Sequence, residues 1–187
     1  MKPVLPLTPS QTVGPYFTIG MSRSENEGRM PTPIGNEIIG EGESINIIGK
    51  VLDGENNVVP DALLEIHQAD FSGSFTNSEF FGFARSHMGQ GPEGGYLFKT
   101  IKPGVVSASE APYISVIVYM RGLLTHTYTR IYFSDEKIAN ADDALLSQIE
   151  ESRRKTLIAK RDDSDGGVTY KFYINMQGEQ ETVFFFL

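Results

Sequence analysis

The sequence predicts a mainly β protein, an antiparallel β-sandwich of the kind that carries one or two short helices and long loops. About seven short segments rich in β-branched and aromatic residues recur along the chain, separated by turn residues. Turn formers are also frequent, since 19 of the 187 residues are glycine and 10 are proline. The chain is long enough to bury one sizeable core, and no internal repeat divides it.

Apolar alternation and β-branched residues predict where the strands lie. They are expected at residues 44–52, 62–68, 95–101, 112–119, 123–133, 157–160 and 168–174, and in the C-terminal stretch TVFFFL. Turns are expected at Arg121-Gly122 and at Asp165-Gly166-Gly167. The C-terminal Leu187 is expected to be buried against the domain or a partner.

One helix is expected, over residues 140–150. Asn140 is placed to cap it, Asp143 stands at its third position, and Ala144, Leu145 and Ile149 recur at helical spacing. The charged stretch 151–161 is expected at the surface. Residues 69–88 form an aromatic stretch punctuated by glycine.

The chain is expected to divide into an N-terminal arm with a partner-contacting loop, residues 1–43, and a β-sandwich core domain, residues 44–187. The run TPSQTVGPYF, residues 8–17, contains two prolines that fix φ and remove backbone donors. It therefore predicts a stiff extended arm, although a tail packed on its own domain is the alternative. Residues 18–43 are expected to be either a disordered loop or a segment that a partner chain orders.

Charge and composition exclude several classes of function. The net charge is -8, which disfavours binding to nucleic acid. No apolar run approaches the length of a membrane span, and the N-terminal residues do not resemble a secretory signal. The absence of cysteine fits a reducing compartment, so a cytoplasmic protein is expected.

Self-contained catalytic motifs are not found. The three histidines are far apart in the sequence, without metal-ligand spacing, and there is no nucleophile elbow, P-loop or glycine-rich dinucleotide fingerprint. Arg130 is the exception, because it shares a strand face with Tyr128 and Tyr132. Its guanidinium is suited either to lie at a rim and cover apolar surface or to bind a carboxylate.

Four stretches, in this order, resemble the intradiol ring-cleavage dioxygenases: TPSQTVGPYF, GKVLDGENNVVPDALLEIHQAD, GGYLFKTIKPG and RIYF. The late stretch TLIAKR and the ending QGEQETVFFFL extend the resemblance over nearly the whole chain. The resemblance implies a β-sandwich that cleaves a catechol ring between its two hydroxyls. It also implies non-haem Fe(III), held by two tyrosinates and two histidines.

The chain departs from that family at the iron ligands. The four ligand positions are Phe75, Val106, Tyr113 and Ser115, and the position of a family arginine is Glu110. Phenylalanine and valine cannot ligate iron, serine is a poor ferric ligand, and one tyrosine cannot hold the ion. The resemblance therefore implies a chain that binds no metal, is inactive alone, and pairs with an iron-bearing beta subunit.

The resemblance also implies a substrate pocket where the two chains meet. It is lined by Thr12, Gly14 and Pro15, with Tyr16 adjoining and Arg130 nearby. The implied substrates are protocatechuate and O₂, and the pairs are expected to assemble into a larger symmetric oligomer. Two alternatives are a free-standing β-sandwich module that binds a small molecule and an active single-chain enzyme, against which the missing ligands argue.

Overall fold

The computed structural model describes residues 14, 17–18, 21, 34–164 and 166–186. Its strands are β1 (Ser44–Gly49), β2 (Val51–Leu52), β3 (Leu63–His67), β4 (Phe83–His87), β5 (Tyr96–Ile101), β6 (Tyr113–Tyr119), β7 (Thr127–Phe133), β8 (Ile158–Asp162), β9 (Val168–Lys171) and β10 (Ile174–Asn175). Eight of them are hydrogen-bonded in the order β4-β3-β6-β7-β8-β9-β1-β5, and β10 pairs with β2.

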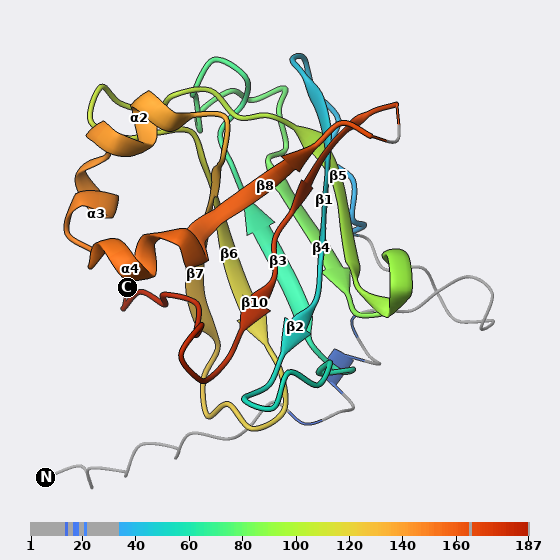
Figure 1. Ribbon diagram of the computed structural model, residues 1–187. Helices are drawn as coiled ribbons and strands as arrows, with labels where there is room; N and C mark the ends of the chain where they lie inside the picture. Colours follow the sequence, from blue (N-terminus) through green and yellow to red (C-terminus); the bar gives the residue numbers. More distant parts are fainter. Residues whose placement is uncertain (1–13, 15–16, 19–20, 22–33, 165, 187) are drawn as a thin grey trace, which may run out of the picture.

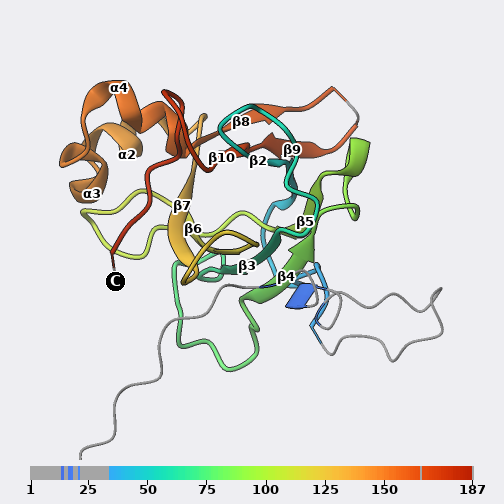
Figure 2. The ribbon, with the colours of Figure 1, turned by 90° about the horizontal axis from the view of Figure 1, so that it is seen from below.

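These strands form two layers that face each other. Strands β4, β3, β6 and β7 make one layer, and β8, β9, β1 and β5 make the other (Figure 1). Seen along the strands, the layers curve toward each other and enclose the core (Figure 2). The predicted fold class is therefore confirmed, with a barrel-like closure.

Residues 34–38 help to close this barrel between the two end strands, β4 and β5. The Gly35 carbonyl accepts from the Arg85 amide of β4 at 2.8 Å, and the Asn36 carbonyl accepts from the Lys99 amide of β5 at 2.9 Å. The two strands also meet directly, because the Leu97 amide donates to Ser86 Oγ at 3.2 Å. The expected division of the chain at residue 43 stays a prediction.

The core between the layers is built from the alternate residues of each strand. Its fully buried side chains include Ile47, Ile66, Phe98, Ile131 and Phe133. Along β7 the inward residues Thr129, Ile131 and Phe133 alternate with Arg130 and Tyr132, as the sequence predicts. The side chain of Arg130 consequently lies on the outer face of its layer.

Short helices cover part of that outer face. They are α2 (Lys137–Asp142), α3 (Ala144–Ser147) and α4 (Glu151–Arg154), with 3₁₀ turns η2 (Pro92–Gly94) and η3 (Lys155–Leu157). Leu146 and Leu157 from this region pack on Tyr113 and Tyr132, forming a second, smaller core outside β6 and β7.

The expectation of one helix over residues 140–150 is wrong. Asp143 has extended backbone angles, φ -67° and ψ 124°, and interrupts the helical run. Its carboxylate accepts from the amides of Leu145 and Leu146 and caps α3, and it also accepts from the distant Ala111 amide at 2.8 Å. Asn140 caps nothing; its side-chain amide donates to the Phe133 carbonyl at 2.7 Å.

Several strand expectations also need correction. The expected strands 44–52 and 168–174 are each divided in two, into β1 and β2 and into β9 and β10. Strand β4 lies within the aromatic stretch 69–88, where none was predicted, and β7 begins at Thr127 rather than at residue 123. The described part of the C-terminal stretch, up to residue 186, pairs through an isolated bridge between Phe185 and Tyr128 and forms no strand. Leu187 lies outside the described residues. The sheet is also mixed, because β1 pairs with β9, β7 with β8, and β2 with β10 in parallel.

The turn predictions are confirmed where the structure describes them. Gly122 has φ +87° in the turn after β6, and Gly166 has φ +77° between β8 and β9. Asp165 of the second turn lies outside the described residues. Among the described residues, no helix has both the length and the apolar character needed to cross a bilayer.

Candidate functional site

The outer face of β3, β6 and β7 brings several of the residues singled out in the sequence together. His67 on β3 lies opposite Ser115 on β6, and Ser115 lies opposite Arg130 on β7. The Phe75 ring lies over His67, with 5.0 Å between the ring centroids. We call this surface the Arg130 patch; it comprises His67, Phe75, Val106, Glu110, Tyr113, Ser115, Arg130 and Tyr132.

Arg130 is held at the centre of the patch by an aromatic ring and weak polar contacts. Its guanidinium carbon lies 3.7 Å from the centroid of the Tyr113 ring, a cation–π contact. Its Nη1 donates to Glu110 Oε1 at 3.2 Å and to the Tyr132 hydroxyl at 3.4 Å. The side chain is 22% exposed, so the positive charge remains accessible from outside.

The phenols of the patch are kept protonated near neutral pH. Burial raises the pKa of Tyr113, although the Arg130 charge opposes this shift. Burial likewise raises the pKa of Tyr132 to about 12. Burial alone would lower the pKa of Arg130, but its hydrogen bond to Tyr132 and the neighbouring phenols raise it, so the guanidinium stays charged.

The donor set of the patch does not fit ferric iron. Val106 packs on the small outer core beside Tyr113, and Phe75 contributes only its ring. Tyr113 is the one family-ligand position with a phenol, and a single phenol cannot hold the ion. Across the described residues, no group of three or more His, Cys, Asp or Glu side chains could hold a metal ion.

The N-terminal arm reaches the same outer face further along β6. The Phe17 ring packs on Tyr119, with 5.3 Å between centroids, and the Phe17 amide donates to the Gly14 carbonyl at 3.0 Å. Tyr119 is four residues from Ser115, about 13 Å away at roughly 3.3 Å per residue. Thr12, Pro15 and Tyr16 lie outside the described residues, so whether they join Arg130 in the expected pocket stays a prediction.

An aromatic and charged group around Tyr119 was not expected from the sequence. The Tyr119 ring contacts His126, and the His126 Nε2 atom lies 2.6 Å from the Tyr128 hydroxyl. The Tyr119 hydroxyl donates to Glu65, whose carboxylate is paired with Arg85. Burial and the Glu65 charge raise the pKa of Tyr119 to about 12. Only the cross-strand register, which the sequence does not reveal, could have grouped these residues.

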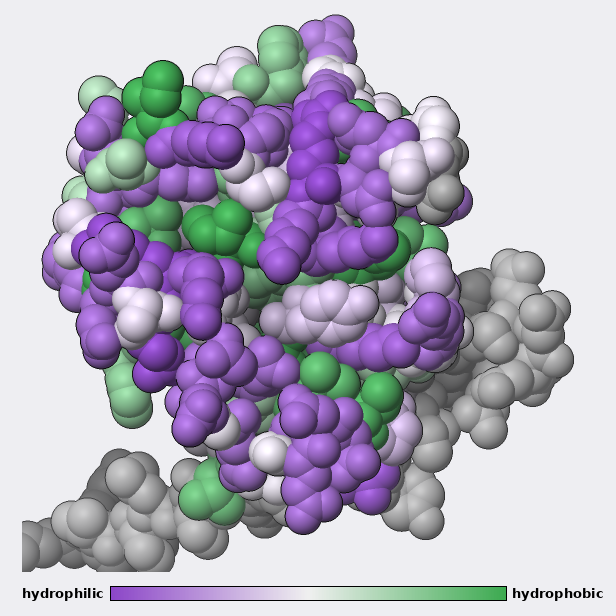
Figure 3. Space-filling view, in the orientation of Figure 1, coloured by the Kyte–Doolittle hydropathy of each residue, from purple (hydrophilic) through white to green (hydrophobic). Residues whose placement is uncertain are grey.

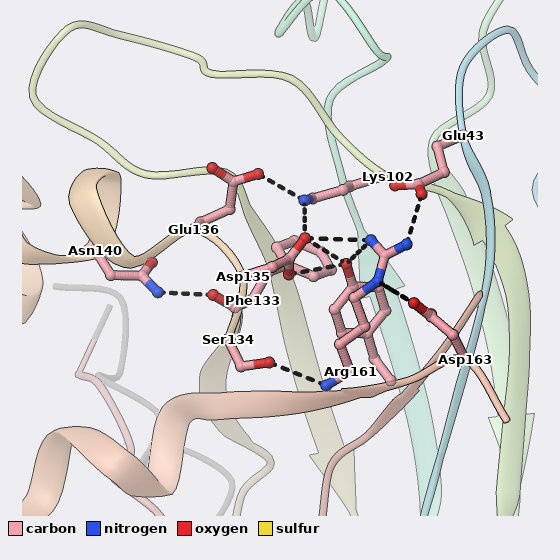
Figure 4. Close-up of polar contacts among 10 residues, drawn as sticks. Glu43, Lys102, Phe133, Ser134, Asp135, Glu136, Asn140, Arg161 and Asp163 are labelled. Carbon is pink, nitrogen blue, oxygen red and sulfur yellow. Dashed lines mark hydrogen bonds and ion pairs between the residues drawn. The ribbon is translucent and has the colours of Figure 1, made fainter.

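A second cluster of charges lies at the other end of β7, where Lys102 meets two acidic side chains (Figure 4). The Lys102 ammonium donates to Asp135 at 2.7 Å and to Glu136 at 2.6 Å. We call it the Asp135 network; it comprises Glu43, Lys102, Asp135, Glu136, Arg161, Asp163 and Tyr170. Because these residues tie the ends of β5, β7, β8 and β9 together, the network is suited to a structural role.

Comparisons with known proteins agree with the resemblance read from the sequence. The chain is 45% identical over 189 residues to a protocatechuate 3,4-dioxygenase alpha chain of Burkholderia cepacia, covering 95% of this chain and 96% of the relative. It is 40% identical to a protocatechuate 3,4-dioxygenase alpha chain of Pseudomonas putida, covering 97% of each. No protein-family model matches the chain.

A solved structure shows the same fold at low identity. It is the dioxygenase domain of a dioxygenase–carbohydrate-binding protein fusion from Streptomyces sp. SirexAA-E, with a TM-score of 0.62 and 19% identity, covering 94% of this chain and 100% of that one. The alpha-chain relatives match nearly end to end, and the solved structure repeats the arrangement of the sheet. The chain therefore belongs to the protocatechuate 3,4-dioxygenase alpha-chain family.

Proposed function

We propose that this chain is the non-iron alpha chain of a protocatechuate 3,4-dioxygenase and forms the catalytic pocket together with an iron-bearing beta chain. The locants 3,4 denote the two hydroxyl-bearing carbons of protocatechuate, so the bond between them is the one cleaved. Both atoms of O₂ enter the product, which carries two new carboxylates and the original one. The absence of cysteine favours a reducing compartment, and we place the complex in the cytoplasm.

The observation that carries this assignment is the Arg130 patch. Its residues Phe75, Val106, Tyr113 and Ser115 are the positions that the family resemblance assigns to iron, and they gather on one face without a suitable donor set. Since these residues cannot hold Fe(III), we place the metal and its chemistry in the beta chain.

This chain contributes binding surfaces to the shared pocket. We assign Thr12, Gly14, Pro15 and Tyr16 of the arm to the wall around the substrate ring. Gly14 is suited to this position, since nothing among the described atoms lies within 4 Å of an added Cβ and the ring can approach its backbone. Arg130 supplies a positive charge for an anionic aromatic substrate. We also propose that alpha–beta pairs assemble into a larger symmetric oligomer.

Separate and joint expression of the two chains tests the assignment. The chain alone should contain no stoichiometric iron and show no tyrosinate-to-iron absorption. Together with the beta chain it should form a stable complex that cleaves protocatechuate. An alpha chain that is coloured and loaded with iron would overturn the proposal. A stable, inactive monomer that does not bind the beta chain would favour a free-standing binding module.

A substitution in the arm tests the pocket assignment. Gly14→Val should fold and assemble, because the described structure leaves the Cβ position open. We expect KM for protocatechuate to rise while kcat changes less, since the added methyl groups obstruct binding of the ring. Loss of assembly in place of a higher KM would mean that the arm acts mainly as an interface.

A further inference from the structure

A pocket on the layer opposite the Arg130 patch is lined by three lysines. It has a volume of about 530 Å³ and lies over β8 and β9, between η3 and the chain that follows β10. Figure 3 has the orientation of Figure 1, and over β8 and β9 it shows hydrophilic residues next to residues of intermediate hydropathy. We call it the lysine pocket; its lining is Lys155, Thr156, Ile158, Lys160, Lys171, Phe172, Tyr173, Asn175 and Gln180.

The lining is cationic in a protein that is otherwise acidic. Among the described residues, the lining contains Lys155, Lys160 and Lys171 and no aspartate or glutamate, although the whole chain carries a net charge of -8. Lys171 is paired with Asp162 at 2.6 Å. Within the described part of the chain, Lys155 and Lys160 have no carboxylate within ion-pair distance. Two positive charges of the pocket are therefore left uncompensated.

The strand register forces two of these charges together. Lys160 on β8 lies directly opposite Lys171 on β9 in an antiparallel pair. Like charges at such positions repel and destabilise the sheet. Asp162 compensates the charge of Lys171 but not that of Lys160. An anion bound beside Lys160 would therefore reduce the remaining repulsion.

The rest of the lining suits a flat, partly apolar ligand. Tyr173 is 48% exposed and Ile158 is half-buried, so both offer apolar surface to the pocket. Thr156, Asn175 and Gln180 add polar groups at its border. The pocket thus places lysine ammonium groups beside the Tyr173 ring and the Ile158 side chain. This combination favours a ligand with a planar carbon ring or chain and carboxylates around its edge.

We propose that the lysine pocket binds a small planar polycarboxylate. A polycarboxylate of the size of a substituted benzene fits the volume of the pocket and offers carboxylates to both Lys155 and Lys160. The reaction assigned above would generate a conjugated tricarboxylate, which makes its product a candidate. That identification rests on the proposed function, whereas the anion preference of the pocket does not.

The test is an NMR titration of the full-length chain with trimesate, a planar tricarboxylate, and with benzoate, which carries a single charge. Trimesate should shift the backbone amides around Lys160, Lys171 and Tyr173 and bind at least tenfold more tightly than benzoate. Lys160→Gln and Lys155→Gln should each weaken trimesate binding about tenfold, as expected for loss of one charge-assisted contact. Lys137→Gln on α2, also at an exposed lysine, should leave the affinity unchanged.

A titration with the ring-cleavage product then separates the two parts of the proposal. Binding of trimesate without binding of the product keeps the pocket and rejects the product as its ligand. Shifts that fail to localise to the pocket, or equal effects of Lys160→Gln and Lys137→Gln, would overturn the pocket itself. If trimesate does not bind but Lys160→Gln weakens assembly with the beta chain, the lysines serve an interface and the proposal is wrong.

Discussion

The Asp135 network and the Arg130 patch both gather charged and phenolic side chains around β7, but they satisfy their charges to different extents. In the network, Arg161 donates to three carboxylates, those of Glu43, Asp135 and Asp163, at 3.0–3.3 Å. In the patch, the described residues give Arg130 one carboxylate partner, Glu110, at 3.2 Å, and a long hydrogen bond to the Tyr132 hydroxyl. Arg161 is therefore shared among three carboxylates, whereas Arg130 lies mainly against the Tyr113 ring.

This difference separates a structural device from a recognition surface. A charge with several short contacts at the ends of four strands stabilises the fold and has little affinity left for a ligand. A charge held by a ring and one partly exposed carboxylate can exchange that carboxylate for a substrate or a partner at small cost. Substitutions in the Asp135 network should therefore lower stability more than activity, and substitutions in the Arg130 patch should lower activity more than stability.

The largest effect on stability is expected for Asp135→Asn. Asp135 accepts from the Lys102 ammonium at 2.7 Å and from the Tyr170 hydroxyl at 2.9 Å. An asparagine at this position would place its NH₂ group, a donor, against one of these two donors. We expect a loss of about 2–4 kcal/mol in the free energy of unfolding, measured in urea, because the Lys102 side chain is only 14% exposed. Ser152→Ala on α4, remote from the network, is the control. A loss below that of a typical surface substitution would mean that the network is dispensable.

The pH dependence of stability gives a second readout for the same residue. Burial raises the pKa of Asp135, but the hydrogen bonds from Lys102 and Tyr170 outweigh it and the net shift is downward from 3.8. A carboxyl with a lowered folded-state pKa stabilises the protein above its unfolded-state pKa and loses this contribution as the pH falls through the folded-state value. The difference between wild type and Asp135→Asn should therefore shrink as the medium is acidified below about pH 4.

An intermediate effect is expected for Asp70→Asn, in the loop that carries Phe75. Asp70 accepts from Ser72, from the Ser74 amide at 2.9 Å and from the Asn77 side chain at 2.9 Å. The bond from Asn77, with those from Ser74 and Ser72, lowers the pKa of Asp70 to about 2. We expect a loss of about 1–3 kcal/mol near neutral pH, because the new amide faces the Asn77 amide donor.

Acid should remove this difference at a predictable point. The Asp70 contribution is complete above pH 3.8 and is lost as the pH falls through about 2. Urea unfolding of both proteins between neutral pH and pH 2 would check it. A stability gap that persists at pH 2 would show that the loop depends on the shape of Asp70 rather than on its charge.

Much of this architecture was accessible from local sequence patterns, and the exceptions have physical causes. Strands β5 and β6 follow from alternation of large apolar residues. Strand β4 was missed because its inward residues are Ala84 and Ser86, and the second is buried through a hydrogen bond to the Leu97 amide rather than by apolar character. The helix break at Asp143 was missed because one of its partners, the Ala111 amide, is 32 residues away in the sequence.

The functional surface could be predicted only in part for the same reason. The closeness of Ser115 and Arg130 follows from a local antiparallel pair, β6 with β7. The contribution of His67 and Phe75 requires the pairing of β3 with β6, which are not consecutive strands. No local pattern reports that pairing, so the composition of the Arg130 patch became visible only in three dimensions.

The smallest effects on stability, and the sharpest on activity, are expected within the Arg130 patch. Glu110→Gln removes a pair whose side chains are 22% and 26% exposed, so the free energy of unfolding should fall by no more than about 1 kcal/mol. Arg130→Met keeps apolar cover over Tyr113 but removes the charge. In the complex with the beta chain, Arg130→Met should lower kcat/KM for protocatechuate about tenfold, the value of one charge-assisted contact.

Comparison with an uncharged substrate shows which of the two roles of Arg130 is correct. Catechol lacks the carboxylate, so Arg130→Met should change its kcat/KM little, and Glu110→Gln, which frees the guanidinium, should not lower kcat/KM for protocatechuate. Equal losses for the two substrates would mean that Arg130 acts through packing on Tyr113. Because Glu110→Gln leaves that packing in place, a loss of activity in this variant as well would point to the ion pair itself as the element that positions the surface.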